Sequence, residues 1–395
     1  MQSTKSIDTP EQNPAKKPIR ILHVVGGMNR GGIETWLMHI LRNIDRQKFQ
    51  IDFLVHTTEP CAYDDEIRAL GSQVIACTPP SLKWWTYDAH LSQILKQDGG
   101  YDIVHSHVHH FSGYVLRLAK QAGIPVRIAH SHNDTSFAEA QRGWKRKAYI
   151  TLMEQLIARY ATLGLAASHD AAVDLFGANW QSDSRWQLLF CGLDLKPFQV
   201  RVDKENIRSQ LGIPNDTFVV GHVGRFEAQK NHQFLLEVAA EVARREPKMH
   251  LLLIGDGPLR GEMEAKVAQL DLSDRVTFAG LRPDVPLLMM GAMDAFLFPS
   301  LYEGLGLVLI EAQAAGLPCL LSDVIPIEAD VVKPLMKRLS LNQSAAYWAE
   351  ELLSQRATPF PAEALISVMS SQFNLDVSLT QLIKIYQLSQ IEIID

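Results

Sequence analysis

The sequence predicts an α/β protein built from two Rossmann-like halves, and three observations support this fold class. A chain of 395 residues can bury two separate hydrophobic cores. Short apolar runs of strand length alternate with helical segments, which is the pattern of parallel βαβ units. The alternation pauses near Cys191–Asp194 and begins again at Phe218, so we expect the boundary between the halves at about residues 195–200.

The elements of the first half follow in order from the hydrophobic pattern. Ile19–Val25 is a buried strand that ends in two glycines, and a helix should follow over about Gly32–Asn43. The next strands predicted by apolar runs are Phe49–Val55, Asp102–His107 and Val126–His130.

The second half repeats this alternation. A helix should begin near Asn231, and another should stop at Gly316-Leu317-Pro318, because glycine and proline end helices. Ser378–Gln390 has apolar residues at helical spacing and is predicted to be the last helix. The strands predicted in this half are Val219–Val223, Leu251–Ile254 and Val276–Gly280.

Composition excludes several classes of protein. The formal net charge of −6 argues against a nucleic-acid partner held by a broad basic surface. Four cysteines without a Cys-x-x-Cys pair argue against a disulfide scaffold or zinc cluster and favour a cytoplasmic location. Residues 1–18 are polar and proline-rich, which predicts a disordered leader rather than a signal peptide. No apolar run reaches the ~18 residues that a membrane-spanning helix needs.

The most informative stretch lies between two carboxylates, Glu303 and Glu311. Glu303 precedes a glycine-rich turn, and Glu311 lies inside an apolar helix. This arrangement places the first acid at a helix N-terminus, where free backbone N–H groups converge. The second acid should project from the first or second helical turn into the same cleft. Such a loop could bind the hydroxyls of both a sugar and a ribose.

A basic pair, Arg225 and Lys230, lies between the strand Val219–Val223 and the next helix. Two cations at a strand-to-helix junction suit a diphosphate, since the helix N-terminus also favours negative charge. A solvated surface pair is the alternative.

The segments Phe298–Gly306 and Glu311–Pro318 resemble the donor-binding signature of retaining glycosyltransferases of family 4, which have the two-domain GT-B fold. The resemblance covers nearly the whole chain from Ile19 to Tyr386. It implies an acceptor-binding domain over residues 19–197 plus 378–395, to which the last helix crosses back, and a nucleotide-sugar-binding domain over residues 198–377. The segment Leu320–Asp330 looks like that of bacterial capsular and exopolysaccharide glycosyltransferases, but it lacks the commoner Gly-Gly pair, which leaves the donor sugar open.

The resemblance also implies roles for individual residues. Arg225 and Lys230 would hold the donor diphosphate and stabilise it as it departs, Glu303 would hold the sugar hydroxyls, and Glu311 would hold the ribose hydroxyls. Arg282 would approach the nucleobase. The remaining candidate donor contacts are Gly304, Leu305, Gly306 and Leu307, with Gly31 and Gly32 of the first glycine-rich loop, where a plain tight turn is the alternative.

Histidines gather on the predicted strands of the first half. His107 and His109 alternate with His105, so they share one face of an extended strand, and we expect His107, His109 and His132 to line the acceptor cleft. A metal site is not expected, because no neighbouring Cys, Asp or Glu completes a ligand set. Members of the resembled family have a functional histidine near the reacting sugar. We favour His130 for this role and keep His132 as the alternative.

The sequence therefore predicts a retaining transfer of sugar from a nucleotide-diphosphate sugar, with UDP favoured, to a glycan or polyprenyl-diphosphate-linked acceptor. No cofactor or metal is expected. The basic, aromatic segment Arg142–Tyr149 could contact an anionic membrane, or it could be a solvated helix face. A catalytically silent scaffold and a nucleotide-sugar epimerase on the same fold remain as alternatives.

Overall fold

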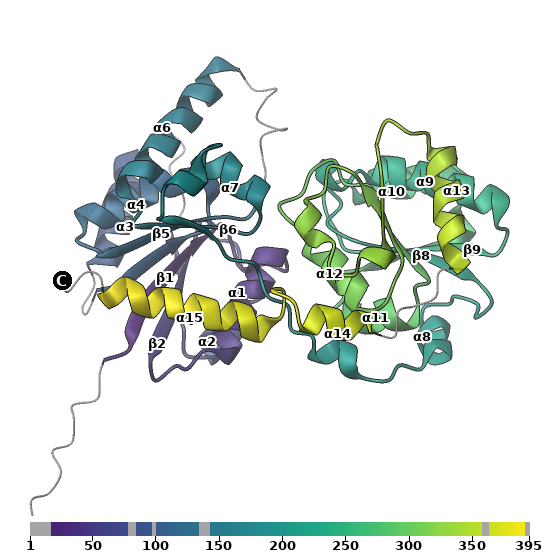
Figure 1. The fold of residues 1–395 in the computed structure, drawn as a ribbon, viewed down its shortest axis with the longest axis horizontal. Coiled ribbons are helices and arrows are strands. Elements are labelled where there is room, and N and C mark those ends of the chain that lie inside the picture. The colour runs from purple at the N-terminus through teal and green to yellow at the C-terminus, as the bar shows by residue number, and fades with distance from the viewer. Residues whose placement is uncertain (1–16, 78–83, 97–99, 134–142, 358–362, 392–395) are drawn as a thin grey trace, which may run out of the picture.

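The structure is a computed structural model that describes residues 17–77, 84–96, 100–133, 143–357 and 363–391. Two α/β domains lie side by side, each with a parallel sheet between layers of helices (Figure 1). Each sheet buries apolar side chains on both faces, as expected for parallel strands covered by helices. The α/β fold class predicted from the sequence is confirmed.

The first domain contains a seven-stranded parallel sheet with strand order β3-β2-β1-β4-β5-β6-β7. Its strands are β1 (Ile19–Val25), β2 (Phe49–Val55), β3 (Val74–Ala76), β4 (Ile103–Ser106), β5 (Val126–Ser131), β6 (Leu163–Ala166) and β7 (Trp186–Leu188). Its helices are α1 (Gly32–Asn43), α2 (Asp64–Ala69), α3 (Trp84–Leu95), α4 (Ser112–Gln121), α6 (Trp144–Tyr160) and α7 (His169–Phe176).

The second domain contains a six-stranded parallel sheet with strand order β10-β9-β8-β11-β12-β13. Its strands are β8 (Phe218–Val223), β9 (Met249–Ile254), β10 (Val276–Gly280), β11 (Ala295–Phe298), β12 (Cys319–Ser322) and β13 (Met336–Leu339). Its helices are α8 (Lys204–Gln210), α9 (His232–Arg245), α10 (Arg260–Gln269), α11 (Val285–Gly291), α12 (Leu307–Ala314), α13 (Ala345–Ser354) and α14 (Ala364–Met369).

The chain passes between the two cores twice. Cys191 packs in the core of the first domain and Leu193 in that of the second, so the first passage lies at Gly192. The last helix, α15 (Leu375–Ile391), then lies along the first domain (Figure 1). Its residues Leu382 and Tyr386 are fully buried there. No helix within the described ranges is long and apolar enough to cross a membrane.

The strand order explains where a ligand can bind. In each sheet the order reverses beside the first strand of the domain, at β1/β4 and at β8/β11. Loops at the carboxyl ends of these strands separate there and leave a crevice, which is the usual ligand position in open α/β sheets. The glycine-rich loop after β1 and the Arg225–Lys230 loop after β8 both lie at such positions.

Candidate active site

The glycine-rich turn that begins at Glu303 leads directly into helix α12. Gly306 precedes the first residue of that helix and has φ +80° and ψ 57°, a left-handed conformation that glycine adopts without steric strain. The turn thus brings Glu303 back over the start of α12, where the backbone N–H groups are not used within the helix. Leu305 is buried in the core of the second domain and anchors the turn.

Lys230 and Glu303 meet across this loop. The Nζ atom of Lys230 lies 2.5 Å from Oε1 of Glu303, and both side chains are largely enclosed, with 17% and 7% of their surface exposed. Lys230 reaches this position because it ends the short 3-10 helix Ala228–Lys230 that precedes α9. The sequence placed these residues 73 positions apart, and the fold joins them in one ion pair.

Arg225 extends from the loop after β8 and is the more exposed cation. Its Nη2 atom lies 2.9 Å from Oε1 of Glu227, and 63% of its side chain is exposed. Burial raises the pKa of Glu34, in the first turn of α1, and a backbone hydrogen bond followed by the charge of Arg225 partly offsets that rise. Arg225 is therefore exposed enough to contact a ligand between the domains.

Glu311 lies in the second turn of α12, as the sequence predicted. Burial raises the pKa of its carboxyl from the ordinary value of 4.5 to about 7. Within the described residues no side chain forms a hydrogen bond or ion pair with it. A carboxyl that lacks partners in the free protein can accept hydrogen bonds from a ligand, and a diol would supply them.

The two domains approach each other closely at the glycines of this site. A Cβ atom built on Gly304 would lie 1.7 Å from the backbone oxygen of His132. A Cβ atom on Gly32 would lie 3.6 Å from Cδ1 of Leu307. Gly31 is the residue before α1, and its side-chain position is taken by the carboxylate of Glu34. The first glycine-rich loop and the donor loop therefore face each other across the cleft.

Arg282 lies away from this ion pair, in the loop after β10. Its guanidinium forms two hydrogen bonds with the carboxylate of Asp284, at 2.8 and 2.6 Å. This pairing raises the pKa of Arg282 and leaves its side chain about one-third exposed. The predicted contact with a nucleobase stays a prediction, and it would require the arginine to share or leave Asp284.

The structure corrects the placement of the histidines. The rings of His107 and His130 are buried and pack against Trp36 of α1, so they do not form the open wall of a cleft. The reason is the register of the sheet: alternating residues on adjacent strands stack beneath α1 and α15. Burial lowers the pKa of His132 to about 3 and that of His130 well below its ordinary value, so both rings are neutral near pH 7.

His109 and His132 are also held by other residues of their own domain. His109 has φ +50°, and its Nε2 atom lies 2.9 Å from Oδ2 of Asp174 in α7. The ring of His132 is buried, but its backbone faces Gly304. Of the two candidates for the histidine near the sugar, His132 is thus the one whose main chain reaches the donor loop.

Sequence reasoning missed Glu34, Glu227 and Cys191. Glu34 could have been found from its position, since it is the acid in the first turn of the helix after the glycine loop. Cys191 lies 3.7 Å from Nδ1 of His132 although the two are 59 residues apart. No local sequence signal marks that contact.

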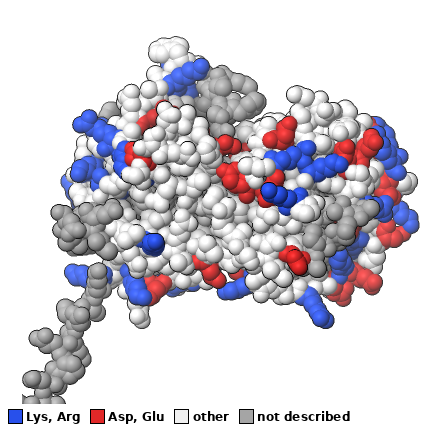
Figure 2. All heavy atoms as spheres, in the orientation of Figure 1, with Lys and Arg blue, Asp and Glu red and all other residues white. Residues whose placement is uncertain are grey.

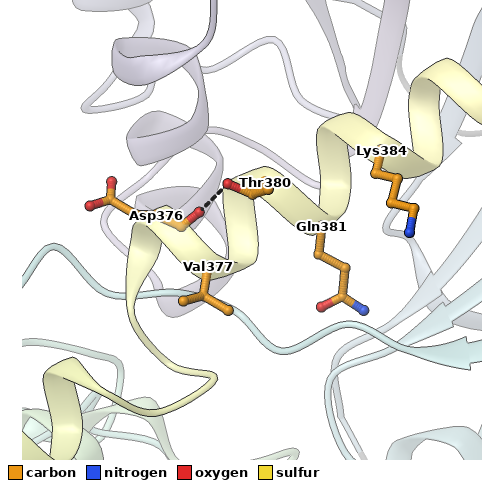
Figure 3. A pocket seen from close by; sticks show the side chains of 5 residues that line it. All are labelled: Asp376, Val377, Thr380, Gln381 and Lys384. Atoms are coloured by element: carbon orange, nitrogen blue, oxygen red, sulfur yellow. Dashed lines mark hydrogen bonds between the residues drawn. The ribbon is translucent and has the colours of Figure 1, made fainter.

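Two surface features lie outside this site. On the face shown in Figure 2, positive and negative side chains are interspersed over the second domain and form no broad basic surface. A shallow depression of about 480 Å³ lies along the start of α15 and is lined by Asp376, Val377, Thr380, Gln381 and Lys384 (Figure 3). It contains none of the residues discussed above, so we do not assign it to the donor.

Two Rossmann-like domains side by side, with the last helix lying along the first domain, form the arrangement of GT-B glycosyltransferases. Family models support this class: "Glycosyl transferase 4-like domain" matches residues 31–185, and "Glycosyl transferases group 1" matches residues 203–354. Together with the relatives described next, these matches show that the chain belongs to glycosyltransferase family 4.

Similar proteins cover most or nearly all of the chain. The chain is 38% identical over 378 residues to the protein named "Putative glycosyltransferase EpsF" of Bacillus subtilis, covering 94% of this chain and 97% of that protein. It is 26% identical over 314 residues to the UDP-Gal:alpha-D-GlcNAc-diphosphoundecaprenol alpha-1,3-galactosyltransferase of Escherichia coli, covering 78% and 80%. The crystal structure of Anabaena Alr3699/HepE in complex with UDP-glucose has the same fold, with a TM-score of 0.78, 20% identity, and coverage of 93% and 99%.

Proposed function

We propose that this glycosyltransferase moves a sugar from a UDP-sugar to a hydroxyl of a glycan or lipid-linked glycan, with retention at the anomeric carbon. The observation that carries the proposal is the Lys230–Glu303 pair beside the N-terminus of α12. This arrangement offers a cation and free N–H groups to a diphosphate, together with a carboxylate for the hydroxyls of the attached sugar.

UDP is favoured as the nucleotide by two similar proteins. The HepE structure contains UDP-glucose, and the name of the Escherichia coli relative contains UDP-Gal. The acceptor of that relative is linked to diphosphoundecaprenol, which supports a lipid-linked acceptor. The similarity to EpsF supports a role in exopolysaccharide biosynthesis.

The chemistry requires stabilisation of the leaving group. As the bond to the anomeric carbon breaks, positive charge develops on the sugar and negative charge on the diphosphate. Lys230, Arg225 and the N–H groups at the start of α12 would stabilise that negative charge electrostatically. Because side-chain cations supply this charge, we propose that transfer needs no divalent metal. Glu303 is held by Lys230, so it is placed to orient sugar hydroxyls rather than to attack the anomeric carbon.

The acceptor would then attack from the face that the diphosphate leaves, with a departing phosphate oxygen taking the acceptor proton. In this scheme Glu311 binds the ribose hydroxyls and contributes to affinity rather than to the chemical step. In this scheme, loss of Arg225 or Lys230 mainly lowers kcat, whereas loss of Glu311 mainly raises KM for the donor.

The test is product analysis with UDP-glucose, UDP-galactose and UDP-N-acetylglucosamine, a polyprenyl-diphosphate-linked acceptor, and EDTA present throughout. An α-linked product from one donor supports the proposal. A donor that is converted to its isomer without acceptor would instead show an epimerase. UDP binding without turnover of any donor–acceptor pair would indicate a scaffold.

We also propose that the protein works at the cytoplasmic side of a membrane, and the exposed start of helix α6 supports contact with a membrane surface. In the basic, aromatic segment Arg142–Tyr149, Arg142 lies outside the described residues. Gly143 is the residue before α6, and Trp144–Tyr149 form the first turns of this helix. Trp144 is 75% exposed and Leu152 is 51% exposed on this projecting helix (Figure 1). The first turns also carry Lys145 and Arg146, whose charges lie over the rings of Trp144 and Tyr149. An aromatic side chain beside basic residues is suited to anionic headgroups.

Sedimentation with vesicles containing anionic lipid tests this contact. We expect the substitution Trp144→Ala to reduce vesicle binding at low salt, and Lys248→Glu on the second domain to leave it unchanged. Equal binding by wild type and Trp144→Ala would show that α6 is a solvated helix.

A further inference from the structure

Five histidines occupy the interior of the first domain at the carboxyl ends of three adjacent strands. This histidine cluster consists of His23 on β1, His105 and His107 on and after β4, and His130 and His132 on and after β5. All five side chains are at least nine-tenths buried, with exposed fractions of 0–8%. The glycosyltransfer chemistry described above uses none of their rings.

Hydrogen bonds join the histidine cluster in two rows across the sheet. In one row, Nδ1 of His23 lies 2.8 Å from Nε2 of His107, and Nδ1 of His107 lies 2.8 Å from Nε2 of His132. In the other row, Nε2 of His105 lies 3.1 Å from Nδ1 of His130. The hydroxyl of Tyr386 in α15 lies 2.8 Å from Nδ1 of His105. A neutral imidazole carries one proton, so each contact between two imidazole rings shares a single proton between two nitrogen atoms.

One nitrogen atom of the histidine cluster lacks such a contact. The Nε2 atom of His130 is buried and makes no hydrogen bond of ordinary geometry in the described part of the chain, although the backbone of Leu189 acts on this ring and partly offsets the lowering of its pKa by burial. A buried polar atom without a partner is destabilising, and it calls for an explanation such as an ion or a function. The ring containing this atom stacks on His132, with their centres 3.9 Å apart.

His107, His130 and His132 also satisfy the spatial condition for binding one metal ion. One ring nitrogen from each lies within 4.8 Å of the others. Three ligands around Zn²⁺ at about 2.0–2.1 Å have their nitrogen atoms roughly 3.3 Å apart in tetrahedral geometry. The shared His107–His132 contact of 2.8 Å would therefore open by about half an ångström.

We propose that His107, His130 and His132 form a buried binding site for a single Zn²⁺ or similar borderline transition-metal ion. Imidazole nitrogen is a preferred ligand of these ions, whereas Mg²⁺ and Ca²⁺ require oxygen ligands, which this site lacks. His107 and His132 are the cluster members that are not fully enclosed, at 8% and 7% exposure, so the ion would enter on their side.

The atoms around the ligands fit this assignment. If Nδ1 of His107 binds the ion, its Nε2 proton is donated to Nδ1 of His23. If Nε2 of His132 binds the ion, the ring proton moves to Nδ1, and Sγ of Cys191 lies 3.7 Å away to accept it. Metal-bound histidines are commonly oriented by an acceptor at the other ring nitrogen in this way.

The sequence argued against metal because no cysteine or acid lies near these histidines along the chain. The fold changes that argument, since it carries the segment after β7 towards the end of β5 and places Cys191 beside His132. The site is a proposal about the interior of the first domain. It does not depend on the proposed reaction, because the ion would lie among side chains that contact neither Lys230 nor Glu303.

The experiment uses the full-length protein, freed of metal with a chelator and then titrated with Co²⁺ as a spectroscopic probe. We expect saturable visible absorption of tetrahedral intensity at one Co²⁺ per chain, displaced by Zn²⁺, and a Tm that rises with Zn²⁺ concentration by mass action. Zn²⁺-loaded protein should show X-ray absorption from nitrogen ligands at about 2.0 Å. No saturable uptake, or a ligand shell of oxygen only, would overturn the proposal.

Matched variants locate the ion. His107→Asn and His132→Asn should abolish the Co²⁺ absorption, whereas His169→Asn, at an exposed histidine, should keep it. Cys191→Ser should weaken binding about 10-fold or more, as loss of an orienting partner does. Cys77→Ser, at another buried cysteine, should not. If a variant fails to fold, the X-ray absorption of the Zn²⁺-loaded wild-type protein still shows whether nitrogen or only oxygen atoms bind the ion. Unchanged absorption in folded His107→Asn and His132→Asn would refute this site.

Discussion

The contact between Gly304 and the first domain can be tested with a single methyl group. In Gly304→Ala the new Cβ would lie 1.7 Å from the backbone oxygen of His132, 2.6 Å from its carbon, and 2.9 Å from Cα of Asn133. Non-bonded carbon contacts lie at about 3.5 Å, so the facing backbone must retreat by roughly 1.8 Å. No side chain can rotate to relieve this clash, because all three atoms belong to the backbone.

The expected result is a loss of activity without a comparable loss of stability. Gly304 has no positive φ, so alanine is compatible with its backbone, and the domains can relieve the clash by separating. Misplacement of a reacting group by about 1 Å can lower the rate about 100-fold, so we expect kcat/KM to fall by at least that factor. The free energy of unfolding should change by less than about 1 kcal/mol. UDP should still bind, because Arg225, Lys230 and Glu311 of its proposed site all lie on the second domain.

Gly306→Ala is the matched control, and the opposite pattern is expected from it. The φ of +80° at Gly306 is unfavourable for alanine, and its Cβ would meet Leu309 and Phe298 of the same domain at 3.3 and 3.4 Å. We expect a loss of about 1–2 kcal/mol in unfolding free energy. Denaturant unfolding, calorimetric titration with UDP, and steady-state kinetics separate the two variants. Wild-type kcat/KM in Gly304→Ala would refute the reasoning, because it would show that this contact is absent when transfer occurs.

Three further predictions concern the charged residues. Lys230→Met leaves the buried Glu303 carboxylate unpaired and should destabilise the protein by about 3 kcal/mol in denaturant unfolding. The double variant Lys230→Met/Glu303→Gln should recover stability but not activity. An unchanged free energy of unfolding in Lys230→Met would contradict a buried ion pair. Arg225→Ala should lower kcat with little change in Tm, since its side chain is 63% exposed, and an unchanged kcat would remove Arg225 from the leaving-group role. The carboxyl of Glu311 has a pKa raised from 4.5 to about 7, so its contribution to stability is present below pH 4.5 and is lost as pH rises through 7. Glu311→Gln should therefore be more stable than wild type at pH 8, by at most about 3 kcal/mol because the side chain is partly exposed. The two proteins should have similar stability at pH 4.5. Parallel profiles of unfolding free energy against pH would contradict this prediction. UDP binding to the wild type should also release protons near pH 7, which calorimetry in buffers of different ionisation enthalpy detects.

Much of the fold followed from local pattern. The helix predicted at Gly32–Asn43 has these bounds in the structure, as does the strand at Phe49–Val55. Glycines, prolines and apolar periodicity act over a few residues, so their consequences can be read along the chain. The two acids of the donor loop were found for the same reason, since one helix and its preceding turn fix their separation.

The partners of the charged and buried groups did not follow from local pattern. Lys230 pairs with Glu303 only because β8 and β11 are neighbours in the sheet although they are far apart in sequence. The histidines were predicted to share a face, but which face is covered depends on where α1 and α15 pack. The alternation of a strand fixes which side chains lie together, and it does not say whether solvent or a helix lies above them.

The sequence by itself thus determined the two α/β halves, the donor loop and the cations that could serve a diphosphate, because each is encoded in contiguous residues. Only the tertiary structure decided that Gly304 meets the backbone of His132 and that Cys191 lies beside a buried group of histidines. These contacts join residues from different strands or different domains. Their distances are set by sheet order and domain packing, which no local spacing in the chain contains.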